Sequence, residues 1–292
     1  MLNMSERFLN LSHELSAKDD SRYHILPVPY DGTSTWKKGA DKGPDALLAA
    51  STVLERYDIE TNSEPCERGI HTLPALRDFR TPENMAEGVR ERLAEIIAQG
   101  AFPILIGGEH SVSIGAGWAA ADAYQNLTVL QLDAHSDLRK AFFGSAFNHG
   151  CVMDRIREKA PIVQVGIRSA EKEEFESVSP ERVFLAADIL TNDAWMSRAV
   201  ALLSENVYVT FDLDALDPSL MPSTGTPEPG GLRWYQTLAF LRRVFFERNV
   251  VGFDVVELCP NGAPHAEFLA AKLVYKMIAY HAARETGRTR LA

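Results

Sequence analysis

Carboxylate and imidazole side chains recur at a spacing of two residues in two segments of the chain. These candidate ligands are Asp133, His135, Asp137, Asp212 and Asp214, and His110 joins them after another apolar run. Extended backbone points residues i, i+2 and i+4 to one side, so each segment can direct its side chains at one point. No Lys or Arg lies within 133–137 or 212–217 to balance the acidic charge. Because uncompensated carboxylates repel one another, the pattern predicts a divalent-metal site.

The donor types indicate which metal fits. Four carboxylates, two imidazoles and no thiolate suit a hard cation such as manganese rather than structural zinc or copper, while magnesium keeps more water. So many protein ligands favour two ions, typically about 3.5–4 Å apart, which lower the pKa of a shared water and yield hydroxide near neutral pH. Each residue alone has a plainer explanation as a turn, cap or hydrogen-bonded polar group, and only their joint occurrence favours metal.

Apolar runs precede these residues and predict the strands that position them. The expected strands span residues 23–28, 102–106, 127–132, 162–165, 182–185, 207–213 and 250–255. Helical periodicity is found at 44–57, 82–99, 234–247 and 267–284. Continuous apolar strands that alternate with helices predict an α/β fold with helices on both faces of a parallel sheet. Such sheets bind ligands beyond the carboxyl ends of the strands, where these candidates and Glu257 fall.

Composition and charge limit the class of protein. The chain has 292 residues, of which 46% are hydrophobic and 24% charged, as in globular proteins. A formal net charge of −10 argues against nucleic-acid binding, and no segment holds the roughly 20 apolar residues of a membrane span. Three widely spaced cysteines favour a reducing, cytoplasmic location. Since no linker or repeat interrupts the chain, we expect one domain over 1–292, with 1–22 as an N-terminal extension.

Several ordered motifs resemble the ureohydrolase family, which includes arginases and agmatinases. They are Gly-Gly-Glu-His-Ser at 107–111, Asp-Ala-His-Ser-Asp at 133–137, Asp-Leu-Asp-Ala-Leu-Asp-Pro at 212–218, Gly-Thr-Pro-Glu-Pro-Gly-Gly at 225–231, and Glu257. The resemblance covers roughly residues 24–281. It implies a three-layer α/β/α sandwich with a largely parallel sheet of about eight strands, two Mn²⁺ per subunit, and assembly into homo-trimers or homo-hexamers. The implied reaction hydrolyses a guanidinium to an amine and urea.

The resemblance also implies roles for individual residues. One manganese would be held by His110, Asp133, Asp137 and Asp212, and the other by Asp133, His135, Asp212 and Asp214, with the bridging pattern left open. We expect the metal-bridging hydroxide to attack the guanidinium carbon while Asp137 accepts its hydrogen bond and helps to protonate the leaving nitrogen. His149 would shuttle protons, although a loop histidine that only bonds its neighbours is the alternative. Glu257 would hold the guanidinium through paired hydrogen bonds, with a structural salt bridge as its alternative.

The segment after Asp137 bears on the substrate. Residues 138–145 lack the Asn with which arginases grip the substrate α-carboxylate, and they resemble agmatinases, as do 30–32, 39–44 and 166–169. The resemblance therefore favours a small cationic guanidino substrate, most of all agmatine, which would be cleaved to putrescine and urea in polyamine biosynthesis. Arg139 and Lys140 leave an alternative open, because either could pair with the carboxylate of 4-guanidinobutyrate or another guanidino acid, or both could be solvated surface cations. Arginase activity is a weaker alternative.

Other classes of function fit the sequence less well. Residues 115–120 satisfy Gly-x-Gly-x-x-Ala, but these glycines do not follow a strand directly, and we expect the small residues to let a helix approach the sheet. A deacetylase that shares this fold would use a single zinc, and Asp137 and His110 argue for two ions. A non-catalytic metal-binding or assembly protein is a further alternative. Cys151 is expected to be a buried thiol rather than a nucleophile.

Overall fold

The strands of the central sheet all run parallel. The computed structural model describes residues 7–287. Its strands are β1 (Tyr23–Val28), β2 (Ile70–Thr72), β3 (Phe102–Gly107), β4 (Leu127–Leu132), β5 (Ile162–Ile167), β6 (Val183–Leu185), β7 (Asn206–Asp212) and β8 (Asn249–Val256). They form an 8-stranded sheet in the order β2-β1-β3-β8-β7-β4-β5-β6. The expected α/β fold and strand number are confirmed, and β2 escaped prediction because Ile-His-Thr is too short to carry a periodic signal.

Helices connect the strands. They are α1 (Gly43–Ser51), α2 (Pro82–Ala98), α3 (Val112–Ala123), α4 (Val152–Ile156), α5 (Lys172–Glu176), α6 (Ala186–Ile189), α7 (Ala194–Leu202), α8 (Trp234–Glu247) and α9 (Pro264–Glu285). Short 3₁₀ turns lie at Phe8–Asn10, His13–Leu15, Lys18–Asp20, Ala40–Lys42, Pro65–Arg68, His149–Cys151, Pro180–Arg182 and Leu213–Ala215. Helix α1 ends at Ser51, short of the expected residue 57, because the next amides, from Thr52 to Leu54, bond to carbonyls three residues back instead of four. None of the helices within residues 7–287 has both the length and the apolar character to cross a bilayer.

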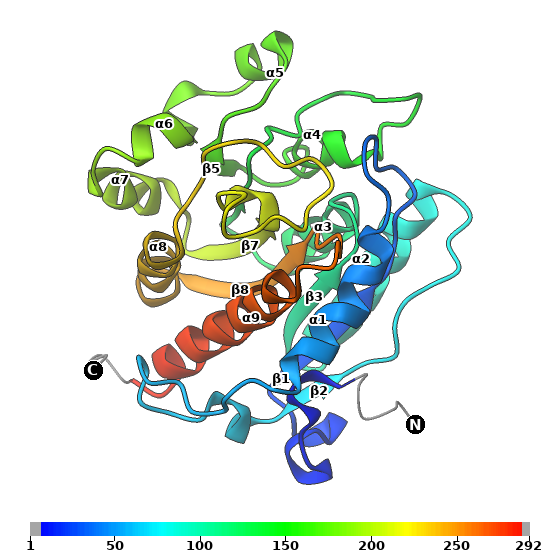
Figure 1. Ribbon diagram of the computed structural model, residues 1–292, viewed down its shortest axis with the longest axis vertical. Coiled ribbons are helices and arrows are strands. Elements are labelled where there is room, and N and C mark those ends of the chain that lie inside the picture. Colours follow the sequence, from blue (N-terminus) through cyan, green and yellow to red (C-terminus); the bar gives the residue numbers. More distant parts are fainter. Residues whose placement is uncertain (1–6, 288–292) are drawn as a thin grey trace.

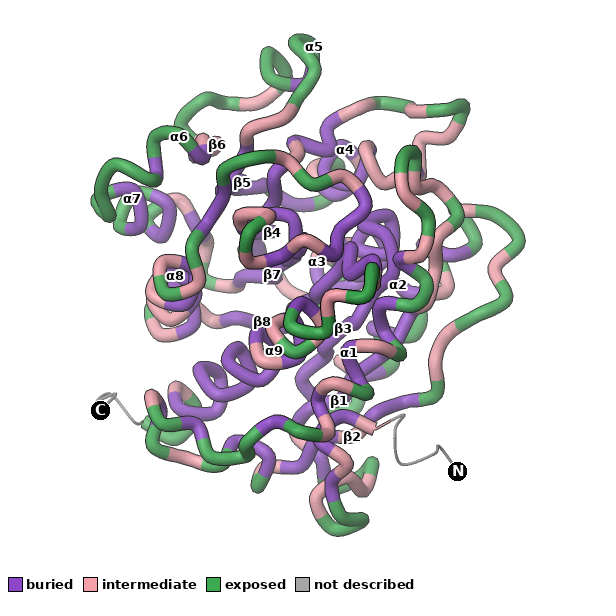
Figure 2. The backbone as a smooth tube through the Cα atoms, in the orientation of Figure 1, coloured by how far each residue is buried: buried purple, intermediate pink, exposed green. Residues whose placement is uncertain are grey.

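Two layers of helices cover the sheet, one on each face (Figure 1). Helices α1, α7, α8 and α9 pack together on one face, and α2, α3 and α4 pack on the other. Each layer closes a separate buried apolar cluster against the sheet. The strands and the inner faces of the helices are accordingly buried along their length, while the exposed residues gather in the connections (Figure 2). This is the three-layer α/β/α sandwich that the resemblance implied.

Helix α2 illustrates how the sequence forms a covering helix. Thr81 caps its first turn by accepting a hydrogen bond from the Asn84 amide, and Pro82 follows at a position that needs no amide donor. The apolar positions Met85, Val89 and Leu93 share one face and are fully buried. The small residues of α3 pack against this helix, since a Cβ on Gly115 would lie 2.1 Å from the carbonyl oxygen of Ala86. A Cβ on Gly117 would lie 2.9 Å from Ile156 of α4, so the two glycines accommodate neighbouring helices, while α3 also packs on the sheet as expected.

The strand order brings distant parts of the sequence to one edge of the sheet. Strands β8 and β7 lie between β3 and β4, so the carboxyl ends of these four strands are neighbours. Parallel sheets bind ligands at such a place because the connections diverge there to opposite faces. The residues that follow these strands lie in the same region of the molecule (Figure 1).

Candidate active site

Imidazole and carboxylate groups meet where β3, β4 and β7 end. Nδ1 of His110 lies 3.1 Å from Oδ2 of Asp133 and 2.9 Å from Oδ2 of Asp137. Oδ2 of Asp212 lies 3.4 Å from the same nitrogen. Ligand atoms of His110, Asp133 and Asp212 lie within 4.8 Å of one another, so these residues could hold one metal ion. We call them the first donor group.

A second donor group lies beside the first. Nδ1 of His135 lies 3.0 Å from Oδ2 of Asp214 and 3.6 Å from Oδ1 of Asp133. Ligand atoms of Asp133, His135 and Asp214 also lie within 4.8 Å of one another. Asp133 belongs to both groups, one oxygen to each histidine, so its carboxylate is placed to bridge two cations. The structure thus brings together all the predicted ligands, with Asp137 beside the first group.

The backbone that achieves this differs from the expected extended strand ends. Strand β4 stops at Leu132, and Asp137 adopts a left-handed conformation with φ +53°. Asp214 lies in the 3₁₀ turn Leu213–Ala215, where its amide donates to Oδ1 of Asp212 over 2.8 Å. The two-residue spacing therefore places these side chains through turns rather than through strand alternation. Left-handed backbone is unfavourable for residues with a Cβ, so the conformation of Asp137 is retained by its surroundings.

A buried hydrogen-bond chain orients His110. Nε2 of His110 lies 2.9 Å from Oγ1 of Thr210, which in turn lies 2.7 Å from Oδ1 of Asp254. Since the Thr210 hydroxyl donates to Asp254, it accepts the Nε2 proton and leaves Nδ1 to face the carboxylates. Among the described residues Nδ1 faces the carboxylates of Asp133 and Asp137 without a well-directed hydrogen bond, which fits a metal ligand. The sequence analysis did not predict that Thr210 and Asp254 orient His110. The charged Asp254 within an otherwise apolar strand was the signal that could have indicated it.

The electrostatics of the site also fit bound cations. Burial, with the charges of Asp214 and Asp133, raises the pKa of Asp212 well above its ordinary value. Burial and the charge of Asp133 likewise raise the pKa of Asp137. Burial alone would lower the pKa of His110, but its carboxylate neighbours outweigh that effect and raise it. Protons on these groups offset the crowded negative charge in the protein alone, and divalent cations would replace those protons.

A cavity of about 250 Å³ opens onto the donor groups. Its walls include His110, His135, Asp137 and Asp212 together with the other two predicted site residues, His149 and Glu257. Oε1 of Glu257 accepts a hydrogen bond from the amide of His110 over 2.7 Å. Burial, followed by the charge of Glu109, raises the pKa of Glu257. Like Asp137, Glu257 has left-handed backbone, with φ +66°. We call this cavity of about 250 Å³ the central cavity.

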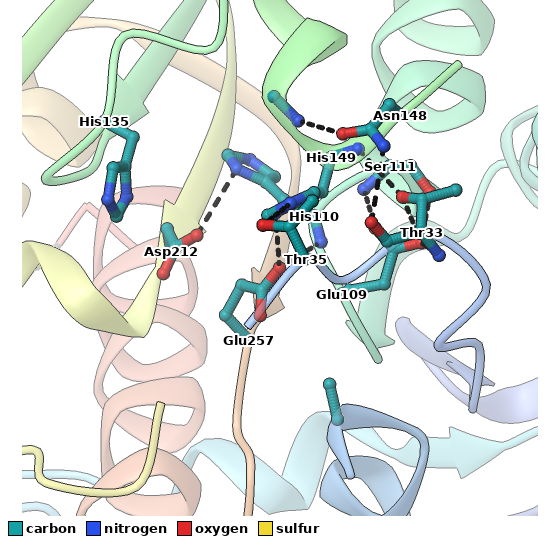
Figure 3. A network of polar contacts seen from close by, with 12 residues as sticks. Thr33, Thr35, Glu109, His110, Ser111, His135, Asn148, His149, Asp212 and Glu257 are labelled. Carbon is teal, nitrogen blue, oxygen red and sulfur yellow. Dashed lines mark hydrogen bonds and ion pairs between the residues drawn. The ribbon is translucent and has the colours of Figure 1, made fainter. Parts of the chain in front are cut away.

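His149 is held by the loop that follows β1, through Thr33 and Thr35 (Figure 3). Its Nε2 lies 3.1 Å from Oγ1 of Thr35, and its amide donates to Oγ1 of Thr33 over 2.9 Å. Thr33 donates in turn to Oε1 of the fully buried Glu109 through its amide and its hydroxyl. Burial and the positive charges of His135 and His110 lower the pKa of His149 to about 4. The imidazole of the protein without metal ions is therefore neutral near pH 7.

The rim of the central cavity carries paired charges. Nη2 of Arg139 lies 3.0 Å from Oε1 of Glu171, and its Nε lies 3.7 Å from Oε2 of Glu174. The Arg139 guanidinium also lies 4.0 Å from the ring centroid of Phe142. Arg139 is thus neither a freely solvated cation nor an unopposed partner for a substrate carboxylate. Lys140 is exposed, as the surface-cation alternative expected.

Residues of the rival interpretations lie elsewhere in the fold. Residues 115–120 are in the middle of α3 rather than at its first turn, so the dinucleotide-binding fingerprint is absent at these positions. Cys151 is buried, and burial raises the pKa of its thiol to about 11, which suits a structural cysteine. The buried His281 contacts Tyr23 in the core, with 3.1 Å between Nδ1 and the phenol oxygen.

Comparisons with known proteins agree with this architecture. The sequence model of the arginase family matches residues 21–279. The chain is 38% identical over 281 residues to an N(1)-aminopropylagmatine ureohydrolase of Synechocystis, with 92% of each chain covered. It is 33% identical to an agmatinase of Pyrococcus horikoshii, over 89% of this chain and 92% of that protein. Its fold superposes on the agmatine ureohydrolase of Thermoplasma volcanium with a TM-score of 0.86 and 29% identity, over 94% and 95% of the two chains.

Two groups of candidate metal ligands at the carboxyl edge of a parallel sheet make this chain an α/β protein with a candidate metal centre. The chain belongs to the arginase family. It is a ureohydrolase, and the family to which it belongs consists of binuclear metal-dependent enzymes.

Proposed function

We propose that the protein hydrolyses the guanidinium of an amine-tailed guanidine, agmatine or N1-aminopropylagmatine, to urea and the corresponding amine. The observation that carries this proposal is the pair of donor groups that share Asp133 beside a cavity containing Glu257. A guanidinium is a cation and a poor electrophile, so its hydrolysis needs an activated water, a carboxylate partner and a proton donor. The described residues supply groups for each of these needs.

The donor groups would hold two manganese ions. The first ion would be held by His110, Asp133, Asp137 and Asp212, and the second by Asp133, His135, Asp212 and Asp214. The oxygen-rich set without thiolates suits manganese over zinc. When bound, such a pair of ions lowers the pKa of water enough to supply hydroxide near neutral pH. Two donor groups also argue against the single-zinc deacetylase alternative.

The remaining steps use side chains of the central cavity. Glu257 would accept hydrogen bonds from the guanidinium and neutralise its charge in a buried site. The carboxylate of Asp137 would take up a proton and deliver it to the departing nitrogen. His149, whose Nδ1 lies 3.8 Å from Oε1 of Glu257 in this cavity, would exchange protons between the cavity and solvent. The product amine, with a pKa of about 10.4, leaves protonated.

The charges at the rim of the central cavity favour a substrate whose tail is cationic. The single charge of Arg139 is opposed by both Glu171 and Glu174, so these three charged side chains, which line the cavity, have a net negative charge. A carboxylate tail, as in 4-guanidinobutyrate, would have to displace these glutamates from Arg139. Relatives named N(1)-aminopropylagmatine ureohydrolase and agmatinase support substrates whose tails end in amines.

The decisive experiment compares urea release from agmatine, N1-aminopropylagmatine, 4-guanidinobutyrate and arginine by the manganese-loaded protein. We expect turnover of the two amine-tailed compounds and little of the two that carry a carboxylate. Metal analysis of the same sample should give two ions per chain, and light scattering should give a trimer or a hexamer. Turnover of 4-guanidinobutyrate alone would replace the proposed substrate, while one bound zinc and amide hydrolysis would favour the deacetylase alternative.

A further inference from the structure

A tight turn extends the wall of the central cavity outward. Phe142 and Ser145 close it with reciprocal backbone hydrogen bonds of 2.9 and 3.1 Å. Its inner positions, Phe143 and Gly144, have φ +45° and +82°. Glycine adopts this left-handed conformation readily, whereas phenylalanine does not. We call residues Phe142–Ser145 the rim turn.

The two phenylalanines of the rim turn form one aromatic surface. Phe142 lines the central cavity, with its ring centroid 6.5 Å from that of His149. The Phe143 ring lies 4.6 Å from the Phe142 ring, yet it is 80% exposed. A strained backbone position thus holds an apolar ring in solvent next to the cavity. Folding alone does not explain this residue, because the ring is mostly unburied and the turn would favour glycine.

We propose that Phe142 and Phe143 form a subsite for the outer aminopropyl arm of a substrate longer than agmatine. This inference rests on the proposed function and narrows its substrate class to N1-aminopropylagmatine. The arm consists of methylene groups and ammonium groups, and aromatic faces bind both, by apolar contact and by cation–π attraction. Phe142 already receives one cation in this way, since the Arg139 guanidinium lies 4.0 Å from its ring centroid.

The charges around the rim turn agree with an ammonium group rather than a carboxylate. Glu171 lines the same cavity and is mostly exposed, so one of its oxygens remains accessible beside Arg139. The guanidinium end of the substrate would lie at Glu257, inside the cavity. The outer arm would then reach Phe142 and Phe143, while the shorter agmatine would end before the exposed ring.

The test replaces Phe143 with glycine. Phe143→Gly removes the ring and relieves the left-handed strain, so the rim turn should persist and the protein should fold. We expect kcat/KM for N1-aminopropylagmatine to fall roughly three- to tenfold, mainly through KM, and that for agmatine to change less than about twofold. Phe143→Tyr should retain the wild-type ratio. Phe268→Ala, which removes a half-exposed ring from α9, is the matched control and should change neither value.

A binding measurement separates this subsite from turnover. Spermidine is the amine product expected from the longer substrate, and putrescine is the product from agmatine. Calorimetric titration of the metal-loaded protein should give tighter binding of spermidine, and Phe143→Gly should remove most of that preference. The subsite would be overturned if Phe143→Gly kept the preference for spermidine over putrescine. It would also be overturned if the variant lost kcat/KM equally for both substrates or changed its oligomeric state. If the wild-type protein binds spermidine more tightly than putrescine and Phe143→Gly removes this preference, but neither substrate yields urea, the subsite stands and the proposed function is contradicted.

Discussion

Nδ1 of His149 lies 3.8 Å from Oε1 of Glu257 in the central cavity. The two residues come from different parts of the chain, one from the loop after Asp137 and the other from the end of β8. A guanidinium bound by the glutamate would therefore lie beside the imidazole. The distance is too long for a hydrogen bond, so both groups keep their capacity to interact with a ligand.

Glu257→Gln separates substrate binding from metal binding. The amide keeps the size of the side chain and can still accept from the His110 amide, but it cannot neutralise a guanidinium. Loss of a buried charge pair should lower kcat/KM for the amine-tailed substrates by about 30- to 1,000-fold. Glu257 belongs to neither donor group, so metal content should not change. The exposed Glu173→Gln is the control, and an unchanged KM and rate in Glu257→Gln would refute the assignment.

His149→Ala tests proton transfer. We expect kcat to fall by about 100-fold, because a positioned acid or base contributes at least that factor, while the metal content stays constant. Thr35→Val removes only the contact between Oγ1 and Nε2 of His149, so it should lower kcat much less. Wild-type turnover by His149→Ala at unchanged metal content would leave His149 as a structural loop residue.

Asp133→Asn should affect both ions at once. Its two carboxylate oxygens face His110 and His135 separately, and an amide replaces one oxygen with a donor nitrogen. After manganese loading and desalting, inductively coupled plasma mass spectrometry should find about two manganese ions per chain in the wild type and fewer than about one per chain in Asp133→Asn. Asp217→Asn, in the same acidic motif as Asp212 but outside the donor groups, should bind metal as the wild type does. Retention of both ions by Asp133→Asn would exclude the bridging role.

Thr210→Val tests the orientation of His110. Valine matches threonine in shape but cannot accept the Nε2 proton, so the imidazole loses the partner that fixes its ring. Loss of such a partner lowers metal affinity by about 10- to 100-fold. Competition with a fluorescent chelator measures this affinity, and Thr237→Val, a buried substitution on α8, controls for general destabilisation. Equal affinities in Thr210→Val and the wild type would show that the ring is fixed by other contacts.

The sequence predicts the sheet and the metal ligands for the same reason. Apolar runs define buried strands, and residues such as Asp133 and Asp212 lie at the carboxyl ends of those strands, so parallel topology alone assembles them. The sequence does not predict the side-chain contacts that depend on the paths of long loops. Glu109 binds Thr33 across 76 positions of sequence, and Thr210 reaches His110 across 100. These pairings follow from strand order and loop path, and periodicity carries no information on either.

The pairing of Lys276 with Asp58 makes stability depend on pH far from the central cavity. Nζ of Lys276 lies 2.8 Å from Oδ2 of Asp58, and both side chains are almost fully buried. Burial alone would raise the pKa of Asp58, but the hydrogen bonds from Lys276 and Thr61 outweigh it and lower the pKa. A lowered folded pKa means that this stabilisation is complete above the unfolded pKa of about 3.9 and is lost as pH falls through the folded value.

Asp58→Asn should therefore lower the free energy of unfolding by about 1–3 kcal/mol near pH 7, where Glu60 still neutralises Lys276 at 2.6 Å. The difference from the wild type should shrink below about pH 4, because the wild-type carboxylate is then protonated as well. Urea titrations of both proteins at pH 7, 5 and 3, in EDTA so that metal release does not contribute, measure this difference. The exposed Asp41→Asn provides the control. A difference between Asp58→Asn and the wild type that stays constant or grows on acidification would mean that the Asp58 charge does not stabilise the fold.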